Sequence, residues 1–137
     1  LFPYTTLFRS RDKGTLEDYL LKNERKNMSK VVAEGTKNAK LAKLDYEVLM
    51  YNEEIDLSVI RVLLHTGRHH QIRLQLANIG HSIYGDQKYG TRGRGKQIAL
   101  WAYKLSFVHP VTKEEMSFKV LPEINGTWKI IDGLHIE

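Results

Sequence analysis

Residues 66–90 read TGRHHQIRLQLANIGHSIYGDQKYG. Apolar side chains recur within this stretch at helical spacing, at Ile72, Leu76 and Ile79. This periodicity predicts a helix from Gln71 to Ile79, and Gly80 provides the residue at which such a helix ends. The stretch is therefore expected to place one helix after a strand.

The residues on either side of the predicted helix have turn chemistry. Thr66-Gly67 is expected to end the preceding strand, and Gly85-Asp86 is expected to form a tight turn. Within the helix, Arg73 lies about 100° around the axis from Ile72, so an apolar seam runs beside a basic one. One face is predicted to pack while the neighbouring face contacts a ligand.

Positive charge is concentrated around this stretch. Between Arg61 and Lys104 the sequence has eight Lys or Arg and a single acid, Asp86, whereas the remainder of the chain has 13 basic and 15 acidic residues. A surface of this kind is the electrostatic footprint of a protein that binds a phosphate backbone. The alternative is an ordinary solvated surface, which accounts for most charge runs.

The composition limits the class of protein. With 137 residues, 42% hydrophobic and 27% charged, residues 11–137 are predicted to form one soluble globular domain or part of one. No apolar run reaches the roughly 20 residues that span a bilayer, so we expect no membrane partner. The absence of cysteine excludes thiolate metal sites and disulfides and is compatible with a cytoplasmic location.

The first ten residues are predicted to have a different origin from the rest. Leu1 to Ser10 reads LFPYTTLFRS and resembles the in-frame translation of a sequencing-library adapter. We therefore exclude residues 1–10 from the fold as a non-native segment and expect that the natural beginning of the protein, upstream of Arg11, is missing.

Local patterns predict the remaining elements. Thr15 is expected to cap a helix, and alternating apolar residues predict strands joined as two hairpins, the second strand of the first hairpin being central in its sheet. The expected elements are a helix at Leu16–Asn23, a short strand at Lys30–Ala33, a turn at Gly35–Asn38, a hairpin of Ala42–Tyr51 and Leu57–His65, a second hairpin of Ile98–Val108 and Glu115–Val120, and a short closing helix within Pro122–Gly133.

Four histidines lie close in sequence, at positions 65, 69, 70 and 81. Imidazoles one turn apart can bind zinc, but the neighbouring arginines repel a cation, so we expect no metal. Hydrogen bonds from His69 or His70 to backbone or RNA are the favoured alternative. The glycines of Tyr89–Lys96 alternate with Arg92, Arg94 and Lys96, which predicts a flexible cationic loop that follows a phosphate backbone.

Asp86 and Arg73 each allow two interpretations. A carboxylate among cations stays ionised and could be a nucleophile, but we favour a Gly-Asp turn in which Asp86 caps neighbouring amides. Arg73 cannot be a base, whereas it can hold a carboxylate or phosphate through a bidentate pair. No acid in the chain is clearly its partner, so we expect a substrate phosphate or an acid in a missing part. The alternative is a surface arginine paired with solvent or Glu47.

The motif Thr66–Arg73, continued through Gly80-His81, Gly85-Asp86 and Tyr89-Gly90, resembles the RluA-type pseudouridine synthases. The likeness continues over Leu100–Glu114, so that together it covers most of residues 42–120. The resemblance implies an α+β fold with a curved, mixed but mainly antiparallel sheet and a few short helices. It further implies conversion of uridine to pseudouridine in ribosomal or transfer RNA without a cofactor, with the target base flipped out of the RNA stack.

The resemblance also assigns site residues. Arg73 corresponds to the basic residue that pairs with the family's nucleophilic aspartate, and Ile72 to the apolar residue that lines the base pocket. Residues expected to contact RNA are Arg68, His69, His70, Gln71, Lys88, Arg92, Arg94 and Lys96. The nucleophile belongs to an Arg-Leu-Asp motif that is absent from this sequence, in which Lys43-Leu44-Asp45 comes nearest. Trp101 stands where the family often has histidine.

We therefore expect the C-terminal part of a pseudouridine synthase catalytic domain, monomeric when intact. The isolated chain is expected to bind RNA weakly, to catalyse nothing and to aggregate through unpaired strands. A non-catalytic RNA-binding module is the alternative function, and a metal-dependent nuclease lacks the ligands that it needs.

Overall fold

The computed structural model describes residues 12–137, so the adapter-like segment lies outside the described residues. The chain divides into two compact units, one that ends at Ile98 and one that comprises Ala99–Glu137. The boundary falls in the run QIALWA, which contains neither glycine nor proline to mark a linker. Each unit is described by itself below.

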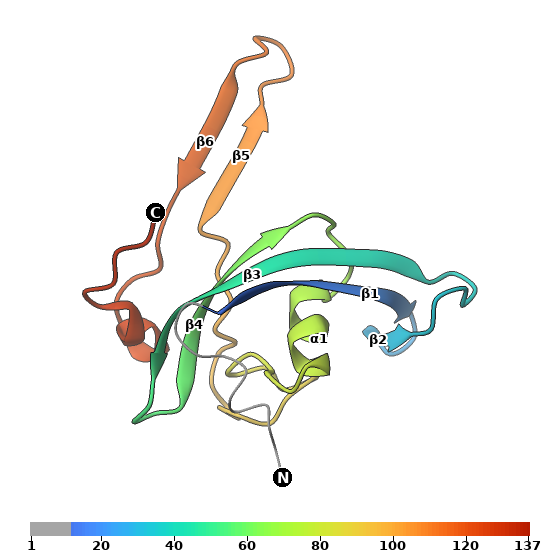
Figure 1. The fold of residues 1–137 in the computed structure, drawn as a ribbon, viewed down its shortest axis with the longest axis horizontal. Coiled ribbons are helices and arrows are strands. Elements are labelled where there is room, and N and C mark those ends of the chain that lie inside the picture. Colours follow the sequence, from blue (N-terminus) through green and yellow to red (C-terminus); the bar gives the residue numbers. More distant parts are fainter. Residues whose placement is uncertain (1–11) are drawn as a thin grey trace. The chain divides into compact units, whose positions relative to one another are not determined.

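The first unit is built on a four-stranded antiparallel sheet with the order β2-β1-β3-β4. Its strands are β1 (Lys13–Asn23), β2 (Met28–Val32), β3 (Lys40–Asn52) and β4 (Leu57–Leu64). The sheet is strongly curved, and β1 and β3 arch over the helix α1 (Figure 1). The unit thus has two layers, a sheet and one helix against its inner face.

The predicted helix at Leu16–Asn23 is wrong, because these residues belong to strand β1. Two leucines one turn apart also fit a strand, in which Leu16 and Leu20 point to the same face. Leu20 is buried, and β1 pairs with β2 on one side and with β3 on the other. Thr15 caps no helix; its hydroxyl donates to Asp45 of β3. Pairing with two strands outweighs the weak local preference for helix.

The first predicted hairpin is confirmed as β3 and β4, joined by the turn after Asn52. The strand predicted at Lys30–Ala33 is β2, which begins two residues earlier, at Met28. The central position expected for β4 is wrong, since among residues 12–137 β4 pairs only with β3 and lies at an edge. The apolar residues of β4 are not buried throughout, because Val59 is buried whereas Leu63 is 63% exposed.

Helix α1 (Gln71–Asn78) confirms the predicted helix and its stop. Gly80 has a φ of 83°, in the left-handed region that glycine adopts without strain. The N–H of Gly80 donates to the carbonyl of Ala77, and the N–H of His81 donates to the carbonyl of Leu76. These two bonds form a Schellman motif, which satisfies carbonyls at the helix end and turns the chain back towards the sheet.

The core of the first unit lies between α1 and the sheet. Val48 of β3 and Leu76 of α1 form one buried cluster, against which Ile72 and Ile79 of the predicted stripe pack. A second cluster joins Leu74 to two residues of the strands, Leu20 and Ala42. Because both clusters involve α1, the position of the helix on the sheet is fixed over its whole length.

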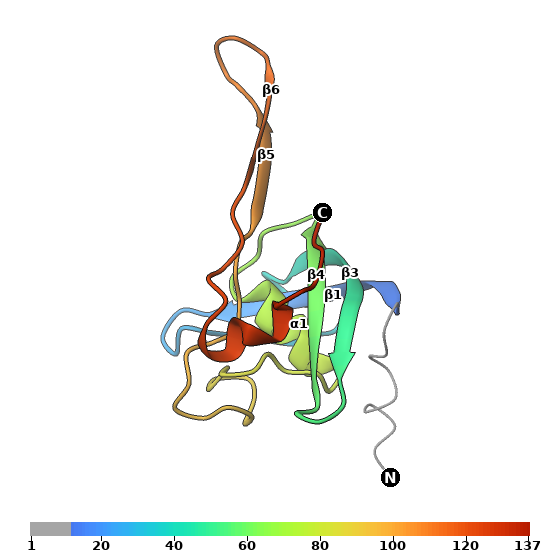
Figure 2. The same cartoon turned by 90° about the vertical axis from the view of Figure 1, so that its left-hand side faces the viewer.

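The second unit contains the second predicted hairpin. Its strands are β5 (Lys104–Val108) and β6 (Glu115–Lys119), which form an extended antiparallel ribbon (Figure 2). β5 is shorter than predicted, because the strand begins at Lys104 and not at Ile98. The closing helix is a 3-10 helix, η2 (Gly126–Ile131), in which Ile131 is buried.

Candidate functional site

The centre of the candidate site is an ion pair between Arg73 of α1 and Asp86 of the following turn. Nε of Arg73 donates to Oδ2 of Asp86 at 3.0 Å, and Nη2 donates to Oδ1 at 2.8 Å. The Asp86 side chain is fully buried, whereas 21% of the Arg73 side chain is exposed. The pair is bidentate, so it fixes both the position and the plane of the guanidinium.

The turn also holds Asp86 from its other side. Oδ1 accepts the backbone N–H groups of Lys88 and Tyr89 at 3.0 and 3.2 Å, which confirms the predicted capping role. Burial raises the pKa of the Asp86 carboxyl, but hydrogen bonds from Arg73 and the backbone outweigh it and the net pKa is lowered. The hydrogen bond to Asp86 likewise raises the pKa of Arg73. Both groups are ionised at neutral pH.

Asp86 is a partner for Arg73 that the sequence did not reveal. Glu47, the alternative partner, lies across the sheet and accepts a hydrogen bond from Arg61 at 2.6 Å. The bidentate pair engages two of the five N–H groups of Arg73, and the other three have no partner within residues 12–137. The guanidinium can thus hold a second anion, and its pairing with a catalytic aspartate outside this sequence stays a prediction.

Tyr89 connects the Arg73–Asp86 ion pair to the sheet. Its ring centroid lies 5.2 Å from Cζ of Arg73, within range of a cation–π contact. Its hydroxyl accepts the N–H of Ser29 in β2 at 2.9 Å and lies 2.8 Å from Nδ1 of His70. A single side chain therefore contacts Arg73, the loop before α1 and a strand of the sheet.

The rings of His69 and His70 lie next to each other before α1, with centroids 3.7 Å apart and planes tilted by 31°. Nδ1 of His69 lies 2.9 Å from Oγ of Ser29, and Nε2 lies 3.0 Å from Oδ1 of Asn27. Burial lowers the pKa of His69, and burial lowers the pKa of His70 to about 4. Both rings are therefore neutral at physiological pH. The prediction that these rings bond to backbone is wrong, because their partners within residues 12–137 are side chains, and hydrogen bonding to RNA stays a prediction.

No group of three His, Cys, Asp or Glu side chains within residues 12–137 is placed to hold a metal ion. Within the same residues no helix is long and apolar enough to cross a membrane.

The other predicted RNA contacts lie around α1 in the first unit. Arg68 is exposed and donates through Nε to the carbonyl of Leu41 at 2.9 Å. Lys88 donates to the carbonyl of Asn27, and Arg92 donates to the carbonyls of Asp56 and Ile55 in the β3–β4 turn. Arg94 and Lys96 are also exposed.

Two predicted site residues pack inside the protein. Gln71 is 3% exposed, and its side chain accepts from the N–H of Arg68 and the hydroxyl of Thr66 and donates to the carbonyl of Lys43. In this structure Gln71 holds the Thr66–His70 loop against β3. Ile72 packs against the cluster of Val48 and Leu76. Its role in a base pocket and the RNA contacts of all these residues stay predictions.

The structure adds Tyr89, Ser29 and Asn27 to the predicted site. Ser29 and Tyr89 are 60 residues apart in the sequence, and Asn27 and His69 are 42 apart. Arg73 and Asp86 are 13 apart, with the helix end between them. No periodic pattern spans these separations, and only the order of residues within the resembling motif pointed to Asp86 and Tyr89.

Comparisons with known proteins agree with the motif. The sequence profile of the family described as RNA pseudouridylate synthase matches residues 4–78, a range that begins within the adapter-like segment. An uncharacterized RNA pseudouridine synthase of Chlorobaculum parvum is 36% identical over 134 residues, which cover 82% of this chain and 40% of that protein. One of Aquifex aeolicus is 37% identical over 94 residues, which cover 61% of this chain and 30% of that protein.

A solved structure shares the fold. Human RNA Pseudouridylate Synthase Domain Containing 1 superposes with a TM-score of 0.63 at 22% identity and covers 92% of this chain and 62% of that chain. This likeness confirms the predicted α+β architecture. The chain spans only 30% to 40% of the length of the two curated relatives above. Since the profile nevertheless matches more than half of the 137 residues, the chain belongs to the RNA pseudouridylate synthase family.

Proposed function

We propose that this chain is the part of a pseudouridine synthase that binds RNA and holds the target uridine beside Arg73. The intact enzyme isomerises a uridine of ribosomal or transfer RNA in the cytoplasm, as a monomer and without a cofactor. The chain alone binds RNA and forms no pseudouridine, because the Arg-Leu-Asp motif of the family's nucleophile is absent from its sequence.

The observation that carries this proposal is the geometry of Arg73. Asp86 fixes the guanidinium through two hydrogen bonds and is itself fully buried. Three N–H donors of a partly exposed guanidinium are left, next in sequence to the apolar Ile72. A cation held rigidly in this way can orient a second carboxylate and keep it ionised. This is the function that the family resemblance assigns to Arg73.

A chimera tests the proposal. The segment of the Chlorobaculum parvum protein that aligns with this chain is replaced by residues 11–137, and the product is incubated with unmodified ribosomal and transfer RNA transcripts. We expect pseudouridine in the wild-type chimera and none with Arg73→Ala. Arg61→Gln serves as the matched control, because Arg61 is also a paired arginine but lies in the sheet opposite Glu47, and we expect it to keep activity.

The isolated chain provides the second half of the test. Incubated with the same transcripts, it is expected to bind them and to yield no pseudouridine. Product that disappears on Arg73→Ala would contradict the assignment of the nucleophile to a part outside this sequence.

One observation favours a second function, a non-catalytic RNA-binding module. Asp86 already gives Arg73 a complete bidentate partner, so the arginine can be explained by structure alone. A chimera that folds and binds RNA but forms no pseudouridine would support this function and reject the first.

A further inference from the structure

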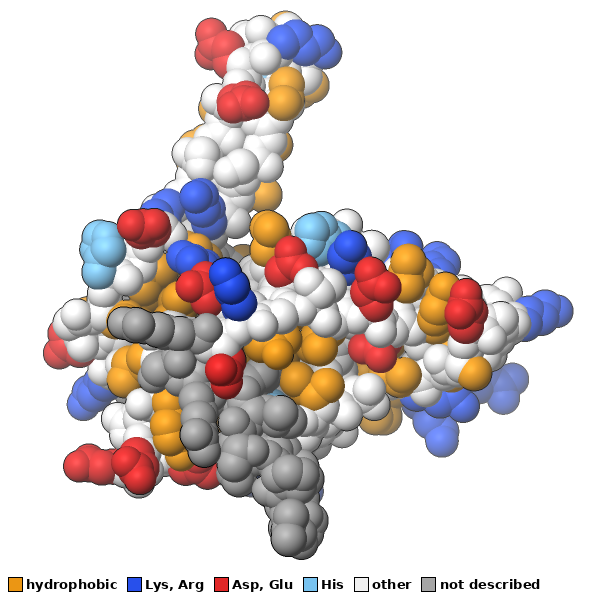
Figure 3. Space-filling model, in the orientation of Figure 1, with side chains coloured by type: hydrophobic (Ala, Val, Ile, Leu, Met, Phe, Trp, Pro, Cys, Tyr) orange, Lys and Arg blue, Asp and Glu red, His pale blue; other side chains and the backbone are white. Residues whose placement is uncertain are grey.

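A second basic region lies outside the cationic window of residues 61–104. Residues 22–43 contain seven Lys or Arg and two Glu. They form the end of β1, the strand β2, the beginning of β3 and the two connecting turns. Figure 3 shows Lys and Arg side chains gathered at this end of the first unit, at the right of the view. The fold therefore adds cations from the strands to those beside the helix.

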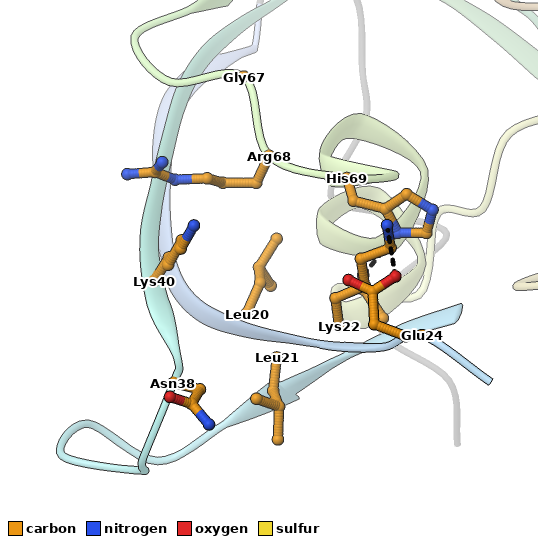
Figure 4. Close-up of a pocket in the computed structure, with 10 residues that line it drawn as sticks. Leu20, Leu21, Lys22, Glu24, Asn38, Lys40, Gly67, Arg68 and His69 are labelled. Carbon is orange, nitrogen blue, oxygen red and sulfur yellow. Dashed lines mark hydrogen bonds and ion pairs between the residues drawn. The ribbon is translucent and has the colours of Figure 1, made fainter. Parts of the chain in front are cut away.

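A cavity of 420 Å³ opens in this region, between the sheet and the Thr66–His70 loop. Its volume lies in the range of small-ligand sites. Figure 4 shows the side chain of Lys40 below that of Arg68, and the side chain of Leu20 between those of Lys40 and His69. Arg73 does not line the cavity, so the cavity is separate from the ion pair described above.

Two cations on the wall of the cavity are available to an anion. Arg68 and Lys40 are exposed, and neither forms an ion pair with a residue in the range 12–137. Arg68 is held in place because its Nε donates to the carbonyl of Leu41. The third cation, Lys22, lies 3.1 Å from the carboxylate of Glu24, which neutralises it. The net charge available to a ligand is therefore supplied by Arg68 and Lys40.

The remainder of the cavity offers apolar and flat surfaces. Leu20 supplies an aliphatic floor, and the ring of His69 is held on both of its nitrogens by Ser29 and Asn27. Burial lowers the pKa of His69, so the ring is neutral and offers a flat surface without a positive charge. A fixed aromatic ring beside cations is the combination that binds single-stranded nucleic acid, in which bases stack and phosphates pair with Arg or Lys.

We propose that this cavity holds one unpaired nucleotide of the bound RNA, with its phosphate against Lys40 and Arg68 and its base against Leu20 and His69. The inference rests on the proposed RNA-binding function and adds a contact away from the modified uridine. A nucleotide within a helix cannot enter, because its base is stacked and paired, so the cavity selects RNA with an unpaired position near the target.

The test measures binding of the whole chain to a labelled single-stranded RNA of about 12 nucleotides, a length within the range that small single-strand binders cover. Fluorescence anisotropy is recorded between about 50 and 200 mM salt, where phosphate contacts are most evident. Lys40→Gln and Arg68→Gln are compared with Lys30→Gln, which removes an exposed lysine of β2 outside the cavity. Circular dichroism confirms that each variant is folded.

We expect each cavity variant to lower the slope of log affinity against log salt by about 0.7, the value of one phosphate contact on single strands. Replacing one nucleotide at a time by an abasic residue should weaken wild-type binding about fivefold or more at one position, and this loss should shrink in Lys40→Gln. Equal effects of Lys40→Gln, Arg68→Gln and Lys30→Gln would overturn the inference and leave the RNA-binding function standing.

Two further outcomes separate the possible failures. If a polyglutamate peptide of matched charge displaces the RNA as well as unlabelled RNA does, the cavity takes anions in general and the nucleotide assignment is wrong. If the wild-type chain does not bind RNA even at the lowest salt, both this inference and the proposed function fail.

Discussion

Replacing Asp86 by Asn tests the ion pair that organises the candidate site. The carboxylate accepts four hydrogen bonds, two from Arg73 and two from the backbone N–H groups of Lys88 and Tyr89. An amide has one acceptor oxygen, so its NH₂ group faces a guanidinium donor. Asp86→Asn thus breaks the bidentate pair and leaves a half-buried cation.

The expected cost follows from the burial of the two partners. Breaking a buried ion pair by removing one charge costs about 3 to 5 kcal/mol. Because 21% of the Arg73 side chain is exposed, water recovers part of its hydration, and we expect about 2 to 4 kcal/mol. The same replacement at the less buried control pair, Glu47→Gln opposite Arg61, should cost less than about 1 kcal/mol. That pair has side chains that are 31% and 43% exposed.

Urea unfolding followed by far-ultraviolet circular dichroism measures these costs. Tryptophan fluorescence is unsuitable, because Trp101 and Trp128 both lie in the second unit. The double variant with Arg73→Gln completes a cycle, in which we expect a coupling of about 1.5 kcal/mol or more. The folded-state pKa of Asp86 is lowered, so its contribution is present at neutral pH and is lost as pH falls below about 4. If the double-variant effect equals the sum of the two single effects to within about 0.5 kcal/mol, the reasoning is refuted.

Three further predictions concern the loops around the site. The pKa of His70 is lowered from 6.5 to about 4, so between these pH values the unfolded chain binds more protons than the folded chain. The free energy of unfolding should therefore fall as the pH is lowered from about 6.5 to about 4, by at most about 1.4 kcal/mol per pH unit. His70→Asn, which tolerates the φ of 53°, should flatten this dependence in pH-dependent urea melts. Gly85→Ala should unfold at lower urea than Gly95→Ala: both glycines have positive φ, but only at Gly85 would a Cβ clash with backbone, at the carbonyl oxygen of Gln97. Tyr89→Phe should lower the free energy of unfolding by about 1 to 2 kcal/mol, because a backbone N–H of β2 loses its acceptor, and unchanged stability would reject that bond.

Local patterns predicted the elements whose signals are short-range. Helix α1 follows from apolar spacing and from Gly80, and the two hairpins follow from alternation and turn residues. The failure at β1 has the same origin, because two leucines four residues apart satisfy both periodicities. The sheet decided the outcome, since β1 pairs with two strands and buries Leu20.

The candidate site divides in the same way. The sequence by itself determined which residue types are present: a cationic window, Arg73 beside Ile72, a Gly-Asp turn, and a motif specific enough to indicate the family. Only the tertiary structure decided that Asp86 is the partner of Arg73 and that Lys40 shares a cavity with Arg68. The physical reason is that no local pattern encodes either contact: Arg73 and Asp86 are 13 residues apart across the end of α1, and the packing of α1 and the loop before it on the curved sheet brings Arg68 to Lys40.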